Sequence, residues 1–196
     1  MKQYRYIDVE FRADEKENKI QGYFSVFGPE YNMGQGISER IDPHAFDVTL
    51  REDTGNIRCL WNHNDDIVLG RTGNGTLILR VDDHGLYGEV TINEEDSDAM
   101  NGLARIRRGD VSQCSFGFEI VEQEILERGN DMLFTIKQAK LWEVSPVTFP
   151  AYRETSISAR KHDAEKARAD CLNAWKIATK ERLRNGIKAV NGKEES

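Results

Sequence analysis

Hydrophobic and polar side chains alternate along much of the first 150 residues, which is typical of β-strands with one buried face. Residues 3–12 and 19–27 predict a first hairpin, and residues 76–81 and 86–92 a second, because polar or glycine-containing turns separate the members of each pair. Between them, residues 30–38 contain Gly34 and Gly36 and predict a mobile loop. The remaining predicted strands are 56–62, 67–71, 111–124 and 132–143.

Three segments change to a helical period. A short helix is expected from Asp42-Pro43, where Asp42 can cap the first turn, to about Thr54-Gly55. A second helix is expected over residues 94–108, with acidic residues at its start, basic residues at its end and Gly109 closing it. From about residue 161 the pattern predicts one long polar helix that frays after Gly186, with residues 191–196 disordered.

These elements predict an α+β or mainly-β fold, with a closed or half-closed barrel of about seven strands flanked by helices. The expected domains are residues 1–159 and a helical, basic tail at residues 160–196. The tail carries a net charge of +4 and the body −11, so the acidic body makes a nucleic-acid partner unexpected.

Composition narrows the functional classes further. The chain has 196 residues, of which 38% are hydrophobic and 31% charged, and no apolar run reaches the length of a membrane span. The first residues lack the apolar core of a secretory signal. Neither the three cysteines nor the four histidines cluster, which disfavours a disulfide framework and a metal site and fits a reducing cytosol. No glycine-rich phosphate loop is present, and no cofactor is expected.

Ser115 is the first candidate for chemistry. By alternation, Ser115 and Gly117 share the strand face opposite Cys114, Phe116 and Phe118. The hydroxyl is therefore expected to be open to approach, with room for a substrate backbone beside Gly117. This pattern alone also fits a solvated serine. Ser112, nearer the start of the strand, and Ser145, before a proline, are alternative hydroxyls.

A serine nucleophile needs a base to remove its proton and a third group to orient that base. His63 is the best candidate base, because it ends an apolar strand at the expected rim of the sheet; a surface histidine in a polar turn is the alternative. Glu143 is the candidate orienting acid, because an unpaired carboxylate is costly in its apolar stretch; a glutamate facing water on an edge strand is the alternative.

Six motifs occur together along the chain. They are Gln21-Gly22-Tyr23-Phe24-Ser25-Val26-Phe27-Gly28, Ile41-Asp42-Pro43-His44-Ala45-Phe46, Trp61-Asn62-His63-Asn64 with Leu69-Gly70-Arg71-Thr72, Arg108-Gly109-Asp110, Ser115-Phe116-Gly117-Phe118, and Glu143-Val144-Ser145-Pro146-Val147-Thr148-Phe149-Pro150-Ala151-Tyr152. In this order they resemble the motifs of the prohead maturation proteases of tailed phages. The resemblance spans about residues 20–155 and leaves the tail outside.

The resemblance implies a serine endopeptidase with a fold like the herpesvirus assemblins, a small β-barrel surrounded by helices. It places the nucleophile on Ser115 and the catalytic histidine on His63. Glu143 corresponds to the third member, although the herpesvirus relatives use a second histidine there. His44 departs from the small residue usual in the family, and we interpret it as a change on a helix surface.

The family role implies cleavage of scaffold and capsid-precursor segments, and of the enzyme itself, inside an immature prohead in the host cytoplasm. Residues 160–196 would be a self-cleavage or targeting segment, and a homodimer or higher self-association is expected. Partners other than these, such as a membrane or nucleic acid, are not expected. Backbone N–H groups around Arg107-Arg108-Gly109 are the expected oxyanion donors.

Two alternative functions stay open: a catalytically silent scaffold or capsid-interaction module of the same fold, and a hydrolase or esterase of small molecules. A silent copy would be expected to have lost Ser115 or His63, and both are present.

Overall fold

The computed structural model divides the chain into two units, residues 1–156 and residues 157–196. The described residues of the second unit are helical and mostly exposed, as the sequence predicts. The predictions for residues after 182, and the expected domain boundary at 159, lie outside the described residues. The structure describes residues 3–7, 12–14, 17–149, 163, 165–166, 168–170, 172–173 and 176–182.

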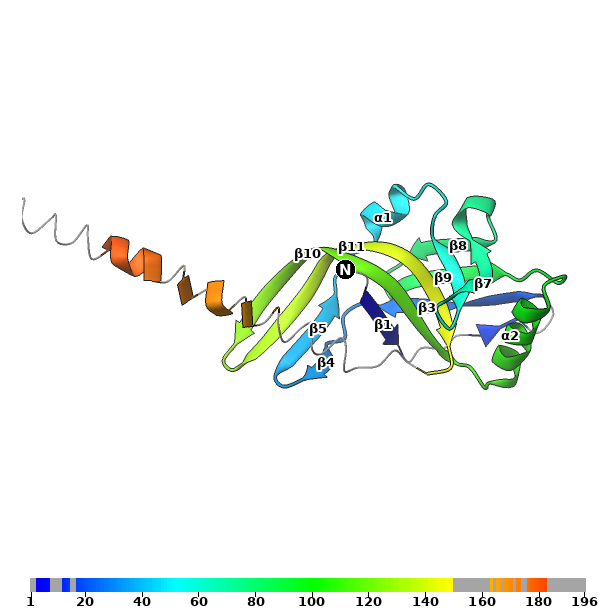
Figure 1. The fold of residues 1–196 in the computed structure, drawn as a ribbon, viewed down its shortest axis with the longest axis horizontal. Coiled ribbons are helices and arrows are strands. Elements are labelled where there is room, and N and C mark those ends of the chain that lie inside the picture. The colour runs from blue at the N-terminus through cyan, green and yellow to red at the C-terminus, as the bar shows by residue number, and fades with distance from the viewer. Residues whose placement is uncertain are drawn as a thin grey trace, which may run out of the picture. The chain divides into compact units, whose positions relative to one another are not determined.

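A seven-stranded sheet forms the larger layer of the first unit (Figure 1). Two long antiparallel strands, β10 (Gln113–Arg128) and β11 (Asp131–Val147), run through its middle. β11 also pairs in parallel with β5 (Ile37–Ile41) and β6 (Arg58–Trp61). Along its main path the order is β1 (Gln3–Ile7), β10, β11, β5 and β4 (Tyr31–Gly34). Off this path, β6 pairs with β11 and with β7 (Asn64–Arg71).

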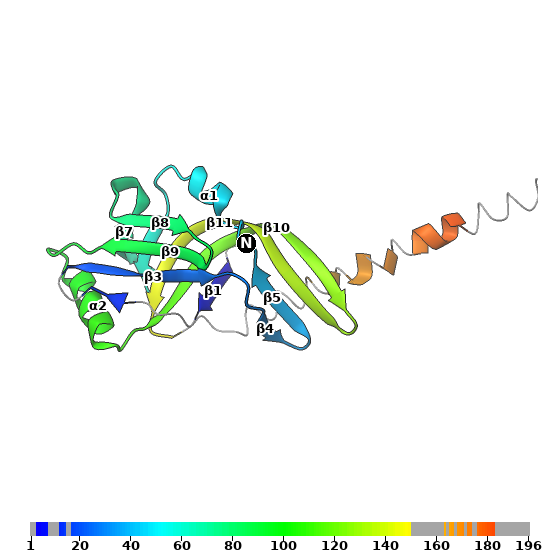
Figure 2. The same cartoon turned by 180° about the vertical axis from the view of Figure 1, so that it is seen from behind.

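A four-stranded antiparallel sheet forms the second layer, seen from behind in Figure 2. Its order is β2 (Arg12–Ala13), β3 (Lys19–Val26), β9 (Gly85–Thr91) and β8 (Leu77–Val81). The hairpin of β8 and β9 confirms the prediction for residues 76–92. A short 3-10 helix, η1 (Thr72–Asn74), joins β7 to β8.

Two helices accompany the sheets. The helix α2 (Ser97–Arg108) begins at Asp96, whose side chain accepts hydrogen bonds from the N–H groups of Asp98 and Ala99, and it ends at Gly109 with φ of +84°. The helix α1 (Asp47–Arg51) is shorter than predicted. Asp42 does not cap it, because residues 43–46 form turns; its carboxylate instead accepts from the His44 N–H.

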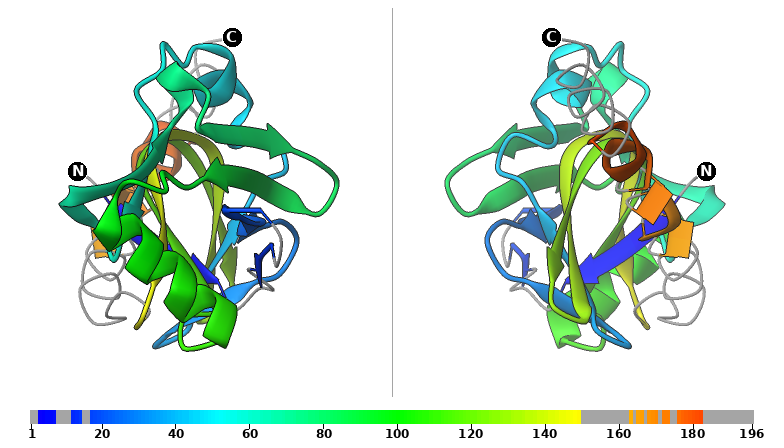
Figure 3. Two further views of the ribbon diagram at one scale, coloured as in Figure 1. Left: turned by 90° about the vertical axis from the view of Figure 1, so that its right-hand side faces the viewer. Right: turned by 90° about the vertical axis from the view of Figure 1, so that its left-hand side faces the viewer.

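The core lies between the two sheets, which Figure 3 shows end-on, and it includes the buried face of α2. Phe24 from β3, Phe46 from the turn before α1 and Phe116 from β10 are all fully buried there. The rings of Phe46 and Phe116 meet edge to face, with centroids 5.7 Å apart. Side chains from both sheets thus share one apolar interior.

Three expectations about the fold need correction. The described strands form two sheets, so the closed form of the expected barrel is wrong, whereas the half-closed form stays a prediction. The segment 30–38 is not a mobile loop but the hairpin of β4 and β5, in which Gly34, Gln35 and Gly36 supply positive φ angles for the turn. The strand expected at 3–12 does not pair as a whole with 19–27: β2 does so, but β1 pairs with β10 instead.

Candidate active site

His63 lies in the tight turn between β6 and β7, where Trp61 pairs with Asn64. Both central residues of this turn, Asn62 and His63, have positive φ, at 52° and 59°. Such angles are what a two-residue hairpin needs, but they are unfavourable for residues with a side chain. Strained backbone of this kind occurs where a side chain must be aimed at a functional site.

Asn62 fastens this turn to the end of β11. Its side-chain oxygen accepts from the Thr148 N–H at 2.7 Å, and its amide nitrogen donates to Thr148 Oγ1 at 3.1 Å. The backbone N–H of Asn62 also donates to the Pro146 carbonyl. These contacts fix the position of His63 relative to β11.

Glu143 faces His63 from β11. One carboxylate oxygen is 2.5 Å from His63 Nδ1, and the other accepts a hydrogen bond of 2.6 Å from Ser145 Oγ. Glu143 is only 2% exposed, so these partners compensate the cost of burying its charge. The alternative of a glutamate facing water is therefore wrong.

Ser115 lies on β10, directly opposite Ser145, and Gly117 lies opposite Glu143. Residues paired in this way project to the same face of an antiparallel sheet. Ser115, Ser145 and Glu143 thus share one face, while Cys114 and Phe116 belong to the core on the other. The expectation of an open hydroxyl is wrong, because Ser115 is fully buried.

Two side-chain atoms of this site have unused hydrogen-bonding capacity. Among the described residues, the buried side-chain atoms without a hydrogen-bond partner are Ser25 Oγ, Ser115 Oγ and His63 Nε2. A buried polar atom without a partner is costly and needs an explanation. A neutral imidazole that donates from Nδ1 to Glu143 leaves the lone pair of Nε2 available to accept a proton, and the Ser115 hydroxyl has a proton to donate.

A comparison with protein-family models gives the family. Residues 7–169 match the model of the caudovirus prohead serine proteases. The chain belongs to this family. No curated protein and no solved structure matches the chain.

The other candidate side chains of this prohead protease lie elsewhere or have another role. Ser112 is exposed and precedes β10, and the Ser145 hydroxyl donates a hydrogen bond to Glu143. His44 is exposed and pairs with Asp47, while the exposed His84 packs edge-on against Tyr23. His162 lies outside the described residues. Across the described part of the chain, no group of three or more potential metal ligands gathers.

The sequence did not single out three residues that build this site: Asn62, Ser145 in its observed role, and Tyr4, whose ring meets His63 edge to face with centroids 4.5 Å apart. The polar doublet Asn62-His63 between two apolar strands was the available signal for the turn. Ser145 follows Glu143 by two residues on β11, so alternation places both on one face. The contact between Tyr4 and His63 joins distant segments, which no local pattern encodes.

The backbone N–H groups near Gly109, which were expected to be oxyanion donors, already donate hydrogen bonds within the protein. The Gly109 N–H donates to the Ile106 carbonyl, and the Asp110 N–H donates to that of Arg105, so both close the end of α2. The side chain of Arg107 donates to the carbonyls of Asp14 and Glu17. These groups therefore stabilise the end of α2 and its contacts with neighbouring segments.

The two described cysteines are not competing nucleophiles. Burial raises the pKa of the Cys59 thiol well above its usual value, and the nearby Glu143 carboxylate raises it further. Burial likewise raises the pKa of the Cys114 thiol. Both stay protonated near neutral pH, and a protonated thiol is a poor nucleophile.

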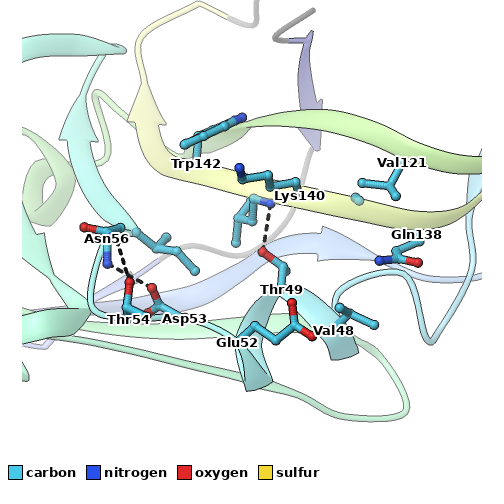
Figure 4. Close-up of a pocket in the computed structure, with 13 residues that line it drawn as sticks. Val48, Thr49, Glu52, Asp53, Thr54, Asn56, Val121, Gln138, Lys140 and Trp142 are labelled. Atoms are coloured by element: carbon cyan, nitrogen blue, oxygen red, sulfur yellow. Dashed lines mark hydrogen bonds between the residues drawn. The ribbon is translucent and has the colours of Figure 1, made fainter.

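A cavity of about 460 Å³ lies between α1 and β11 (Figure 4). Thr49, Lys140 and Trp142 are among its lining residues, and Lys140 Nζ lies 4.2 Å from the centre of the Trp142 ring. Neither Ser115, His63 nor Glu143 lines it.

Among the described residues, no helix has the length and apolar character needed to cross a bilayer.

Proposed function

We propose that this prohead protease is an active serine endopeptidase that cleaves scaffold and capsid-precursor segments during head assembly. The observation that carries the proposal is the hydrogen bond between His63 and the buried Glu143, on the sheet face that also holds Ser115. Ser115 Oγ and His63 Nε2 are both buried there without a hydrogen-bond partner. Family membership supplies the substrate class.

In the proposed mechanism, Ser115 Oγ attacks the carbonyl carbon of the scissile peptide as its proton passes to His63 Nε2. Glu143 stabilises the imidazolium and keeps the ring oriented. The proton then moves to the leaving amine as the C–N bond breaks, which leaves an acyl-enzyme. His63 next removes a proton from water, which attacks the ester, and the proton returns to Ser115 as the acid product leaves.

The family role further supports a place of action inside the immature prohead, in the host cytoplasm. Self-cleavage, a targeting role for residues 160–196, a boundary at residue 159, and self-association are parts of the same proposal. A likeness to the herpesvirus assemblins in fold also belongs here, and it would require the two sheets to correspond to parts of their barrel.

Co-expression with the capsid precursor of the same phage tests the proposal. Ser115→Ala is expected to abolish precursor cleavage, with a loss of at least about 10³-fold, because it removes the nucleophile. His63→Ala is expected to have a similar effect. Precursor fragments are measured by intact mass spectrometry, and thermal unfolding checks that each variant folds.

Ser112→Ala is the matched control, because it removes an exposed hydroxyl close to the same strand. It is expected to cleave at the wild-type rate. Wild-type processing by Ser115→Ala would overturn the assignment of Ser115 as nucleophile, and no processing by the wild-type chain would favour a catalytically silent module.

A further inference from the structure

The strand that carries Ser115 has two edges, and only one of them could receive another chain. β11 pairs with β10 along one edge from Gln113 to Arg128. The other edge is occupied over residues 114–118 by β1, which runs antiparallel to it (Figure 1). In this register Tyr6 lies opposite Ser115, and Tyr4 opposite Gly117.

A peptide to be cleaved must place a carbonyl carbon about 3–3.5 Å from the nucleophile. Extended peptides commonly meet this need by adding a strand to a sheet edge, where main-chain hydrogen bonds hold them about 4.8 Å from the neighbouring strand. For Ser115 this edge is the one that β1 takes. The chain's own residues 3–7 therefore occupy the edge at which an extended substrate would add a strand beside Ser115.

Side chains of β1 hold it in this position. The Tyr4 ring packs edge-on against the ring of His63, with centroids 4.5 Å apart. The Arg5 guanidinium forms two hydrogen bonds with the buried Glu39 carboxylate of β5, one of them 2.8 Å long between Nη2 and Oε2. Arg5 also lies over the Phe118 ring, 5.5 Å from its centre.

The site beside β1 is closed to solvent. Ser115 is fully buried, and neither its hydroxyl nor His63 Nε2 has a partner. β1 is a five-residue strand at the end of the sheet and, among the described strands, pairs with β10 alone. Short edge strands are among the elements that open at low cost in free energy.

We propose that the outer edge of β10 at residues 114–118 is the binding site for an extended substrate segment, and that residues 3–7 occupy it and keep the enzyme latent. This rests on the proposed function. Release of β1 would free the edge for main-chain pairing and expose Ser115. A substrate residue would then replace Tyr4 against His63.

A reversible lock tests the proposal in the full chain. Ile7 lies opposite Cys114, and Cα atoms paired in this way are about 4.5–5.5 Å apart, within the range a disulfide spans. Ile7→Cys, oxidised, should fix β1 to β10. The readout is the rate at which a serine-directed fluorophosphonate labels Ser115, located by peptide mass spectrometry, which also verifies the disulfide.

In the oxidised Ile7→Cys variant, Ser115 is expected to be labelled at least about tenfold more slowly than in the same protein after reduction. The reason is that only molecules with β1 released from β10 react. Ile7→Ser, treated identically, should show no response to oxidant. Equal rates with the disulfide formed and reduced would overturn the proposal.

Glu39→Gln tests the opposite direction without a disulfide. It keeps the shape of the side chain but removes the charge that holds Arg5, so labelling of Ser115 is expected to be at least about fivefold faster than in wild type. Asp42→Asn, which weakens the ion pair with Lys137 and leaves β1 untouched, is the matched control and should match wild type. Slower labelling of Glu39→Gln would mean that β1 supports the site, and would overturn the proposal.

These outcomes are separable from failure of the proposed function. If β1 is not an inhibitor but the enzyme is active, Ser115 reacts at rates that neither the lock nor Glu39→Gln changes in the expected direction. If the chain is not a serine hydrolase, Ser115 is not labelled in any reduced variant, and both proposals fall.

Discussion

Glu143 holds two side chains, His63 and Ser145, with one carboxylate. Its two oxygens serve His63 from the β6–β7 turn and Ser145 from its own strand. The Ser145 hydroxyl donates a hydrogen bond to the carboxylate oxygen that His63 does not contact. The two hydrogen bonds together fix the rotation of the Glu143 carboxylate. The orientation of the proposed base thus rests on a residue that does not touch the substrate.

Removing this support predicts a graded effect. Ser145→Ala is expected to lower kcat about 10-fold with little change in KM, because a hydrogen bond to a charged group contributes about 1.5 kcal/mol. Glu143→Gln should lower kcat further, since it also removes the charge that stabilises the imidazolium. Steady-state cleavage of a precursor-derived peptide measures both.

Fluorophosphonate labelling of Ser115 distinguishes positioning from loss of the nucleophile. Ser145→Ala should still be labelled, whereas Ser115→Ala should not. A wild-type kcat for Ser145→Ala would show that the carboxylate needs no second partner.

Among the elements, α2 supports the turn that carries His63. Gly102 of α2 lies against Trp61, the residue before the turn, so closely that a Cβ at position 102 would come within 3.0 Å of the indole ring. Arg105 of the same helix lies over that ring, 5.9 Å from its centre. The stability of α2 therefore bears on the placement of the Asn62-His63 turn.

The N-terminal cap of α2, the side chain of Asp96, leads to a prediction about stability. Asp96→Ala removes the side chain that accepts from the N–H groups of Asp98 and Ala99. The expected loss in free energy of unfolding is about 1 kcal/mol, with a fall in Tm of about 2–4 °C. Calorimetry measures it. Asp98→Asn, which leaves this cap intact, should have a smaller effect, and an equal effect would show that Asp96 contributes charge and no cap.

At the scale of the whole first unit, the two sheets depend on one interior. Phe46 contacts Phe27, which follows β3 in the smaller sheet, and Phe116 in the larger one, with ring centroids 6.3 and 5.7 Å apart. Because these contacts connect both layers, the sheets are expected to unfold together.

Phe46→Ala should therefore lower the free energy of unfolding by about 3–5 kcal/mol while keeping a single transition in urea. Ile78→Ala is the matched control, since that side chain is 54% exposed, and should change stability by about 0.5 kcal/mol or less. Two separate transitions for Phe46→Ala would show that the sheets are independent.

The elements could largely be predicted because their signals are local. Alternation located the strands of the second hairpin and both long central strands, and the acidic start and final glycine located α2. The segment 30–38 was misjudged because glycines mark both mobile loops and tight hairpin turns; buried Met33 and Ile37 on either side of the turn decide between them.

The sequence by itself singled out the candidates for chemistry, Ser115, His63 and Glu143, and the resemblance named the family that the comparison then gave. Only the tertiary structure decided that Tyr4 packs against His63, that Ser115 is buried, and that β1 lies beside it. The physical reason is that alternation states which face of a strand is buried, whereas the choice of neighbouring strand depends on contacts between segments more than 100 residues apart, such as Tyr6 and Ser115.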